Sequence, residues 1–487
     1  MSISTTLLPH QSMKGFSGTV STCGSEHLRS NLFCASKFNR VNLLDISNLP
    51  VSELMKQHIT SLRVNDESDL EAENAFFVAD LGEVYRQHLR WKARLPRVEP
   101  FYAVKCNPDP VMLKLLAALG LGFDCASKSE IQTILNMGVD PSRIIYANPC
   151  KQASFIRYAA QKDVKMMTFD NVDELYKIKQ YFPSAQLVLR ILADDSKSLC
   201  RLGLKFGASL DSVDQLLQTA QNLELDVIGV SFHVGSGCYD EEVYADAIWR
   251  ARVVFDKASC YNFNFRFLDV GGGFSHLHDG NGITFEKIAN VLDVALKNYF
   301  PEDIRIIAEP GRYYAAPAYT IATQIIARRL VLRDQDDNDE GTREADVVDS
   351  EQTLAEDEQT LAGDEQTLAG DEQSFMYYIN DGVYGAFNCI LFDHQIVHPK
   401  VLIKDDIFYF DTIMPGEPEY SSSVWGPTCD SIDCVNKDSR LPELFPGDWL
   451  YFEEMGAYTI SAASQFNGFM KSNVLYTSTE NKVFEYI

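Results

Sequence analysis

Apolar runs of strand length alternate with stretches of helical periodicity between Phe101 and Ala308. The strand-like runs are Phe101–Val104, Leu121–Phe123, Arg143–Tyr146, Met166–Phe169, Leu187–Ile191, Val227–Phe232, Phe267–Val270 and Arg305–Ala308. The helical stretches between them are Met112–Leu119, Ser129–Met137, Gln152–Gln161, Val172–Gln180, Val213–Leu223, Tyr244–Lys257 and Phe285–Tyr299. Regular β–α alternation indicates a parallel sheet, and eight units predict a closed (β/α)₈ TIM-like barrel, with a doubly wound open sheet as the alternative topology.

The N-terminal edge of this barrel is ambiguous in the pattern. A further apolar run, Phe76–Ala79, precedes a helical stretch at Leu81–Trp91, and we assign 76–320 to the barrel domain. If Phe76–Ala79 is counted, the strand before Lys105 becomes the second and Arg305–Ala308 becomes a ninth. One of these runs must then lie outside the barrel. The preceding segment, 41–75, is amphipathic in part and could pack with a second domain.

The alternation ends after Leu332. Residues 334–373 hold sixteen acidic residues against one arginine, and Glu-Gln-Thr-Leu-Ala recurs every seven residues from Glu351. One Leu and one Ala per repeat form no coiled-coil seam, so we predict a disordered acidic insertion; a docking site for a basic partner is the functional alternative.

Short β-rich runs with Gly and Pro between them follow the insertion. They predict a second, all-β domain over 321–487, of the β-sandwich or modified Greek-key type. The runs are Phe375–Ile379, Val383–Leu391, Val401–Leu402, Phe408–Phe410, Trp449–Phe452 and Tyr458–Ile460.

Composition excludes some classes of partner. The net charge of −26 argues against binding to nucleic acid or to an anionic membrane, and no apolar run is long enough for a transmembrane helix. Eleven cysteines without a CxxC pair or a Cys/His metal cluster predict reduced thiols and a cytoplasmic location. Residues 1–40 are rich in Ser and Thr with few charges, which predicts a disordered tail, with a transit peptide as the alternative.

Lys105 ends the apolar strand Phe101–Val104, just before an Asn-Pro-Asp-Pro turn. In a barrel, such a position faces the catalytic mouth. Desolvation would depress the pKa of this amine and allow it to form a Schiff base. On this stretch alone, a lysine whose charged end merely reaches solvent is the simpler interpretation.

Other predicted strand ends carry polar residues of catalytic type. Asp124 and Glu130 flank Ser127, which also predicts an ordinary helix N-cap. His233 is followed by Gly-Ser236-Gly, so its ring could stack on an aromatic cofactor while Ser236 donates to a phosphate; a buried structural histidine is the alternative. Gly271–Gly273 follow a strand and could cradle an anion, or form a plain turn.

The last predicted barrel strand ends in Glu309-Pro310-Gly311-Arg312. Late barrel strands often bind phosphate, and a carboxylate there could pair with a protonated pyridine nitrogen. In the β domain, Asn380-Asp381-Gly382 is a turn signal, and Cys429 beside Asp430 could supply a proton donor and an anion for a substrate amine. Together these residues describe a pyridoxal phosphate site.

The chain resembles the eukaryotic ornithine decarboxylases, whose alanine-racemase-like barrel is followed by a β domain. The resemblance extends from about Phe76 to Phe469, apart from the acidic insertion, and rests on long phrases. These are PFYAVKCN, GFDCASK, RIIYANPCKQ, LVLRI, GVSFHVGSGC, IIAEPGRYY, NDGVYGAFNCI, WGPTCD and MGAYT.

The resemblance implies roles at the cofactor. Lys105 would form the Schiff base with pyridoxal phosphate, His233 would stack on the pyridine ring, and Glu309 would pair with the ring nitrogen. Three charged residues would surround the Schiff base: Asp124, Glu130 and Arg190. The remaining cofactor-binding residues, most of them at the phosphate, would be Ser236, Gly271, Gly272, Gly273, Pro310, Gly311, Arg312 and Tyr458.

The resemblance also implies roles at the substrate and at a dimer interface. Asp381 and Asp430 would bind the distal amine of ornithine, Cys429 would supply a proton to the carbon that loses its carboxylate, and the pocket would also include Asn380 and Phe466. The family forms its sites between two antiparallel subunits. Cys429, Asp430 and Phe466 would therefore reach the partner's barrel, and Lys205 would pair with Asp433 across the interface.

The implied activity is decarboxylation of L-ornithine to putrescine, the entry step of polyamine biosynthesis, in a cytoplasmic homodimer. Two aspartates for one distal cation favour a diamine precursor, and lysine would be rejected by only roughly 1–3 kcal/mol. A sister lysine or arginine decarboxylase is one alternative. The other is a catalytically inactive binding protein resembling antizyme inhibitors. Binding of antizyme to the helices around Gln152–Gln180 is implied by family analogy alone.

Overall fold

The computed structural model describes residues 46–64, 73–277, 283–332, 373–412, 414 and 416–487. The chain from Leu43 onward forms one compact unit. The predicted tail at 1–40 lies outside the described residues, and so does the predicted acidic insertion except for Gln373.

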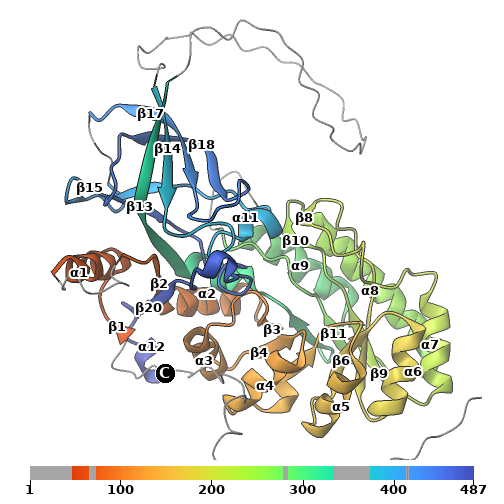
Figure 1. Cartoon of the computed structure of the whole chain (residues 1–487). Helices are drawn as coiled ribbons and strands as arrows, with labels where there is room; N and C mark the ends of the chain where they lie inside the picture. The colour runs from red at the N-terminus through yellow and green to blue at the C-terminus, as the bar shows by residue number, and fades with distance from the viewer. Residues whose placement is uncertain (1–45, 65–72, 278–282, 333–372, 413, 415) are drawn as a thin grey trace, which may run out of the picture. The chain divides into compact units, whose positions relative to one another are not determined.

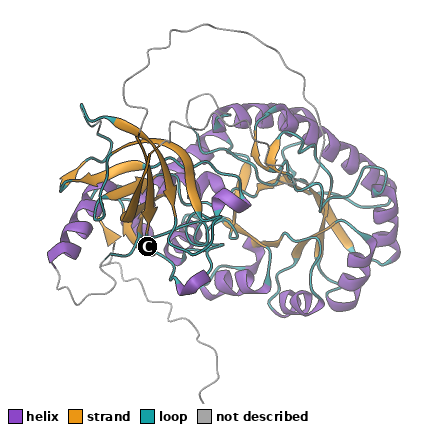
Figure 2. Ribbon diagram, turned by 45° about the horizontal axis from the view of Figure 1, so that its top comes forward, coloured by secondary structure: helices purple, strands orange, loops and turns teal. Residues whose placement is uncertain are grey.

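Eight parallel strands close into a barrel, which confirms the predicted fold class. Each of the eight apolar runs between Phe101 and Ala308 forms one of its strands, and helices surround them (Figure 2). The strands are β3 (Val98–Ala103), β4 (Gly122–Cys125), β5 (Ile144–Tyr146), β6 (Met166–Phe169), β7 (Gln186–Arg190), β9 (Asp226–Ser231), β11 (Phe267–Asp269) and β12 (Arg305–Ala308).

The helices between these strands begin where the sequence supplies caps. Ser127, Asn171 and Thr284 each accept a hydrogen bond from the backbone N–H three residues later. The helices that follow β3 are α3 (Pro110–Ala118), α4 (Lys128–Asn136), α5 (Ala153–Gln161), α6 (Val172–Tyr181), α7 (Val213–Asn222), α8 (Glu242–Cys260) and α9 (Phe285–Tyr299). Within the described ranges, no helix is both long enough and apolar enough to cross a bilayer.

Strand β2 (Phe76–Asp80) lies outside the barrel. It pairs antiparallel with β13 (Tyr319–Leu332) and parallel with β20 (Asn473–Thr477), both of which belong to the sheet of the β domain. The strand before Lys105 is therefore the first of the barrel, not the second, and the apparent ninth strand is accounted for. The predicted barrel domain, 76–320, therefore includes one strand, β2, that belongs to the sheet of the β domain. Helix α2 (Leu81–Arg94) leads from β2 to the first barrel strand.

The β domain is built on one mixed sheet in the order β1-β20-β2-β13-β14-β17-β18 (Figure 1). Strand β13 links its parts by pairing with β2, β14 and β19. Helix α1 (Val51–Val64) buries Met55 and Ile59 against this sheet, so this part of the segment 41–75 packs with the β domain. The other elements are β1 (Ile46–Ser47), β14 (Gln373–Ile379), β15 (Lys400–Lys404), β16 (Ile407–Phe408), β17 (Glu419–Trp425), β18 (Cys434–Pro442), β19 (Trp449–Phe452), α11 (Cys389–Phe392) and α12 (Val483–Tyr486).

Two predicted strands of this domain are wrong. Residues 383–391 form turns and the start of α11 because side chains bond the local backbone. Asn388 Nδ2 donates to Gly385 O at 2.6 Å and to Thr459 O at 2.7 Å. Residues 458–460 form a turn, since Tyr458 has a φ of +55°.

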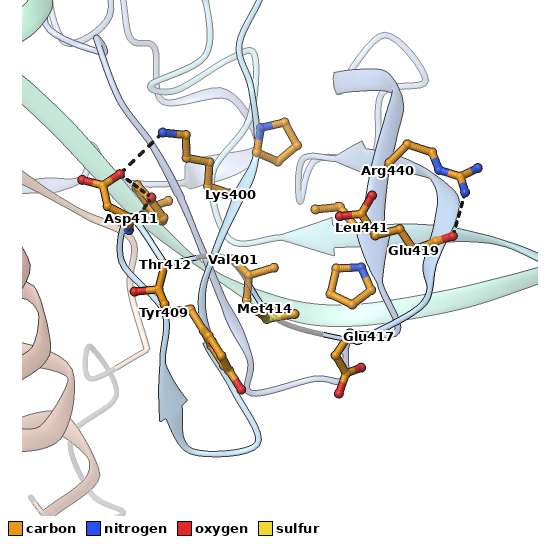
Figure 3. Close-up of a pocket in the computed structure, with 13 residues that line it drawn as sticks. Lys400, Val401, Tyr409, Asp411, Thr412, Met414, Glu417, Glu419, Arg440 and Leu441 are labelled. Carbon is orange, nitrogen blue, oxygen red and sulfur yellow. Dashed lines mark hydrogen bonds and ion pairs between the residues drawn. The ribbon is translucent and has the colours of Figure 1, made fainter.

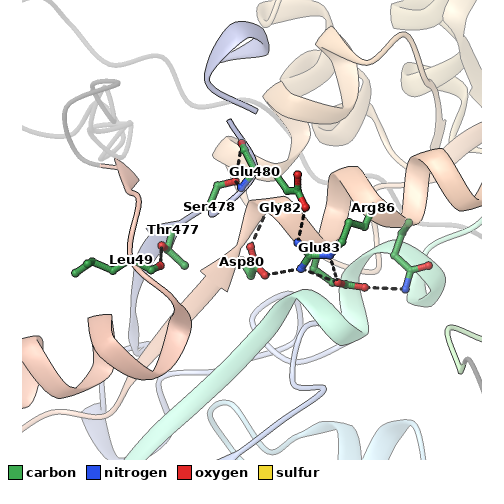
Figure 4. A network of polar contacts seen from close by, with 9 residues as sticks. Leu49, Asp80, Gly82, Glu83, Arg86, Thr477, Ser478 and Glu480 are labelled. Carbon is green, nitrogen blue, oxygen red and sulfur yellow. Dashed lines mark hydrogen bonds and ion pairs between the residues drawn. The ribbon is translucent and has the colours of Figure 1, made fainter. Parts of the chain in front are cut away.

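The chain's C-terminal residues are fastened to the entrance of the barrel. The Arg86 guanidinium on α2 lies 2.8 Å from Asp80, 2.9 Å from Glu83 and 3.1 Å from Glu480 (Figure 4). Asp80 also caps α2 by accepting from Gly82 N at 2.9 Å. Because the Arg86 side chain is 41% exposed, these ion pairs contribute little to the stability of the fold. They fix where the C-terminal residues contact α2.

Candidate active site

One cavity at the carboxyl ends of the barrel strands collects residues from β3, β9, β11 and β12. Its lining consists of Ala103, Lys105, His233, Ser236, Gly237, Gly272, Gly273, Phe274, Glu309, Gly311, Arg312 and Tyr458. Tyr458 comes from the β domain, so the cavity lies where the two parts of the chain meet.

Lys105 forms an ion pair with the buried carboxylate of Asp124. Burial lowers the pKa of Lys105, but the carboxylates of Asp124 and Glu309 outweigh burial and raise it above its ordinary value. The expected depression of this pKa is therefore wrong for the chain as described. Asp124 is what holds the amine charged and in place.

The Glu130 carboxylate binds the backbone at the start of its own helix. Its carboxylate accepts from Ala126 N at 2.5 Å, while Ser127 Oγ accepts from Glu130 N at 3.3 Å. Ser127 therefore caps the helix, and Glu130 binds the backbone just before the cap, so the helix-cap interpretation of this stretch holds. Burial raises the pKa of Glu130. Arg190 ends β7 with its guanidinium 5.2 Å from the Phe206 ring centroid.

His233 is held by the loop that it begins. Its Nδ1 accepts from Gly235 N at 3.0 Å, which leaves Nε2 toward Gly272. Burial, Arg190 and Lys105 all lower the pKa of His233 far below its ordinary value, so the ring is neutral. A neutral, fixed imidazole is suited to stacking rather than to ion pairing.

The glycines after β11 are required by close backbone approach. Gly273 has a φ of +101°, and a Cβ there would lie 2.7 Å from Gly235 O. At Gly272, a Cβ would lie 2.8 Å from His233 Nε2 and 2.9 Å from Glu309 O. The run therefore forms a tight cradle beside His233 and Glu309, which supports the anion-cradle interpretation.

Gly272→Ala is expected to weaken cofactor binding by roughly tenfold to a hundredfold, because overpacking costs typically 1–3 kcal/mol and here displaces His233. Titration of the apoprotein with pyridoxal phosphate measures this. Gly120→Ala is the control: its φ of +92° makes the change destabilising, but its Cβ meets open space. An equal loss of affinity in Gly120→Ala would contradict a local effect.

Arg312 is the cation of the cavity. It donates to Ser236 Oγ at 3.2 Å, pairs with Asp393, and lies 5.4 Å from the Tyr458 ring centroid. Asp393 is buried on the β-domain side of the pair and also accepts from Cys200 Sγ at 3.6 Å. The sequence analysis assigned no role to Asp393.

Two carboxyl groups face each other below the cradle. Glu309 follows β12, and Asp269 ends β11; both are buried. Burial, followed by the proximity of Asp269 and Asp124, raises the pKa of Glu309 well above its ordinary value. Burial also raises the pKa of Asp269 to about 7. At neutral pH, this pair holds a proton that an exposed pair would have lost.

None of the predicted substrate residues of the β domain belongs to the lining of this cavity. Tyr384 joins two of them: its hydroxyl donates to Asp430, and its ring stacks on Phe466 at 4.2 Å. Cys429 is exposed, and its N–H donates to Asn467 Oδ1 at 3.1 Å. Cys429, Asp430 and Phe466 therefore form one exposed group around Tyr384.

Asn380 and Asp381 make their hydrogen bonds within the β domain. Asp381 Oδ1 accepts from Gly382 N at 2.7 Å and Ala386 N at 2.9 Å, and its Oδ2 accepts from Ser472 Oγ at 2.6 Å. Asn380 Oδ1 accepts from Gln324 N at 3.0 Å. These hydrogen bonds hold both side chains at the turn, and neither side chain lines the cavity.

Asp433 is buried and accepts from Val383 N at 2.8 Å and from Thr428 Oγ1 at 2.6 Å. These bonds shape the loop that presents Cys429 and Asp430. Lys205 is exposed, with its amine 5.0 Å from the Phe206 ring centroid. The predicted contact between Lys205 and Asp433 is one between subunits and stays a prediction.

A larger cavity of about 440 Å³ lies in the β domain, between Lys400, Tyr409 and Arg440 (Figure 3). It contains none of the predicted site residues. Arg440 there donates to Glu419 O at 2.9 Å, and Lys400 pairs with Glu453. No histidine, serine or cysteine is among the described residues that line it.

The cavity around Lys105 fits pyridoxal phosphate. Two polar atoms at it are buried and have no hydrogen-bond partner among the described residues: Arg312 Nε and Asp124 Oδ1. A phosphate group suits the free Arg312 Nε and the Ser236 hydroxyl, an aldehyde suits the Lys105 amine, and a flat ring suits the imidazole of His233.

Comparison with known proteins agrees with this fit. Residues 81–316 match the family model described as pyridoxal-dependent decarboxylase, pyridoxal binding domain. The chain is 50% identical over 408 residues to ornithine decarboxylase of Schizosaccharomyces pombe, covering 84% of each chain. It is also 51% identical over 415 residues to antizyme inhibitor 2 of Xenopus laevis, covering 85% of this chain and 83% of that protein.

Among solved structures, arginine decarboxylase of Paramecium bursaria Chlorella virus superposes with a TM-score of 0.73 at 33% identity. The match covers 87% of this chain and all of that one (100%). Matches of this length include both the barrel and the β domain. The chain therefore belongs to the ornithine decarboxylase family of pyridoxal phosphate-dependent decarboxylases.

Proposed function

We propose that this enzyme converts L-ornithine to putrescine and CO₂, the entry step of polyamine biosynthesis, with the cofactor held on Lys105 as a Schiff base. The observation that carries the proposal is the cavity itself. It combines one amine, one neutral imidazole, one buried carboxyl and one arginine with a free donor.

When bound, pyridoxal phosphate supplies an electron sink for the electron pair that the departing carboxylate leaves on the α-carbon. Glu309 would face the ring nitrogen and keep it protonated, and His233 would support the ring face. Ser236, Arg312 and the Gly271–Gly273 cradle would hold the phosphate. Asp124 orients the Lys105 amine before the cofactor binds.

The substrate's distal amine requires carboxylates other than Glu309, which is assigned to the cofactor's ring nitrogen. Asp430 is ionised, because its hydrogen bond from Tyr384 lowers its pKa. It lies beside Cys429 on the exposed loop. We infer that a partner subunit brings this loop to the cavity in a homodimer, where the Cys429 thiol gives its proton to the α-carbon. We infer that Asp393, which pairs with Arg312 of the cavity, serves as the second carboxylate instead of Asp381.

Exposed apolar side chains on the same loops support this homodimer. Phe392 is 70% exposed, Ile396 79% and Met470 76%, and Ile432 and Phe469 are exposed nearby in the chain. Such side chains are typical of a surface that is covered by a partner. Antizyme as a further partner and a cytoplasmic location stay proposals that rest on the family resemblance.

A substrate panel tests the function. Purified enzyme with pyridoxal phosphate is given ornithine, lysine or arginine, and CO₂ release and diamine are measured. Ornithine is expected to lead lysine in kcat/KM by about 10- to 200-fold, the discrimination that one methylene allows. A preference for lysine or arginine would contradict the substrate assignment.

The panel also tests the second candidate function. A relative named antizyme inhibitor matches this chain as well as the ornithine decarboxylases do. A protein that binds pyridoxal phosphate but releases no CO₂ from any of the three amino acids would favour an inactive binding protein. The complete set of cofactor-facing groups supports the enzyme instead.

A further inference from the structure

Asp269 lies against the reaction site without a role in the mechanism above. It ends β11 and is 1% exposed. Its Oδ1 accepts from Gly271 N at 2.9 Å, and Gly271 O in turn accepts from Glu309 N at 2.6 Å. One residue of the cradle, Gly271, thus fixes the positions of Asp269 and Glu309 relative to each other.

The second oxygen of Asp269 has no donor. Oδ2 is buried without a hydrogen-bond partner among the described residues, and the group that faces it is the carboxyl of Glu309. Carboxylate oxygens only accept hydrogen bonds, so two carboxyls can bond to each other only if one of them carries a proton. Buried carboxyl pairs of this kind share one proton because both cannot ionise together.

We propose that Asp269 is a positioning residue that shares one proton with Glu309 and keeps that proton at the carboxyl assigned to the cofactor's ring nitrogen. The inference rests on the proposed role of Glu309 and adds the group that sets its protonation.

The charged groups around the pair act in opposite directions. Asp124 favours protonation of both carboxyls. Arg190 favours ionised Asp269, and Lys105 favours ionised Glu309. Ser231 is the register neighbour of Asp269 on β9, and its hydroxyl has no partner among the described side chains. Burial raises the pKa of Asp269 to about 7, and the pKa of Glu309 lies well above its ordinary value, so the pair loses one proton near pH 7 and keeps the other.

Asp269→Asn tests this directly in the apoprotein. The amide oxygen still accepts from Gly271 N, and the amide nitrogen donates to Glu309, so the geometry is kept while the shared proton is lost. Infrared difference spectra of the wild type are expected to show a protonated carboxyl that titrates near pH 7. In Asp269→Asn this titration is expected to disappear.

Cofactor binding gives the second measurement. Titration of apoprotein with pyridoxal phosphate at several pH values is expected to give a wild-type affinity that changes little below about pH 7. In Asp269→Asn, affinity is expected to begin falling with rising pH at a lower pH than in the wild type, by up to about tenfold for each pH unit, because Glu309 loses the effect of Asp269 that raises its pKa and the proton must then come from solution. Ser231→Ala is the matched control and is expected to follow the wild type.

Glu309→Gln separates the two proposals. It should move the titration of Asp269 away from pH 7, because the hydrogen bond with Glu309 lowers the pKa of Asp269, and it should weaken cofactor binding. If it leaves binding unchanged, the proposed role of Glu309 fails. If it weakens binding but Asp269→Asn keeps the titration near pH 7, only the role of Asp269 fails. Should Asp269→Asn not fold, a titration near pH 7 that persists in Glu309→Gln would show that Asp269 titrates alone and would overturn the proposal.

Discussion

Lys105→Ala is expected to abolish decarboxylation, lowering kcat by at least about ten-thousandfold, as the loss of a covalent catalytic group does in other enzymes. Lys105 is the cavity's amine, since the other cavity-lining side chains are not lysines. CO₂ release measures the activity, and the visible absorption of the bound cofactor shows whether it is covalently linked. The fold should persist because the Lys105 side chain is 39% exposed.

Two controls separate the amine from its charge. Lys105→Arg keeps a cation beside Asp124 but cannot form a Schiff base, so it should lose as much activity as Lys105→Ala. Lys114→Ala removes an exposed lysine of α3 and should behave as the wild type. Substantial activity in Lys105→Arg would show that only the charge is needed and would refute the central assignment.

The barrel was predictable from the pattern because its strands are buried on both faces and its helices on one. Continuous apolar runs then alternate with helical periodicity, and the carboxyl ends of the runs must meet. Strand β2 has the same apolar pattern as a barrel strand. Its partners, β13 and β20, are distant in sequence, and no local signal decides between the two sheets.

The sequence also could not show which carboxylate of the β domain contacts the residues of the cavity. Asp381 and Asp393 lie in one stretch of sequence, and either could serve a substrate amine. Only the fold shows that Asp381 caps its own turn while Asp393 faces Arg312. A turn signal at Asn380-Asp381-Gly382 favoured the structural role from the start. For Asp393 the sequence holds no such signal.

The charge of Lys105 also depends on carboxylates at the ends of other barrel strands, which are distant from it in the sequence. Burial alone would lower its pKa, as the sequence suggested. Asp124 and Glu309 approach it from β4 and β12, and their summed attraction reverses the direction. Individual residues of the site could therefore be predicted from strand ends, but their protonation required the closed barrel.

Mixing two inactive variants is expected to restore about a quarter of the wild-type activity if each site is shared between two subunits. Lys105→Ala removes the amine of the cavity. Cys429→Ala removes the proposed proton donor and should lower kcat by about a hundredfold to ten-thousandfold. Random reassociation makes half of the dimers mixed, and each mixed dimer has one intact site of two. Activity is measured on the reassociated mixture, without separating the mixed dimers from the others.

The pairing of variants makes this experiment decisive. Lys105→Ala mixed with Glu309→Gln is the matched control, because both residues line the same cavity of one chain and no arrangement of subunits can rebuild it. Recovery with Cys429→Ala but not with Glu309→Gln would mean that the exposed loop around Tyr384 acts on a second chain. Mixed dimers that stay inactive would contradict the shared site, and Cys429 would then have to act within its own chain, where it is exposed and outside the cavity.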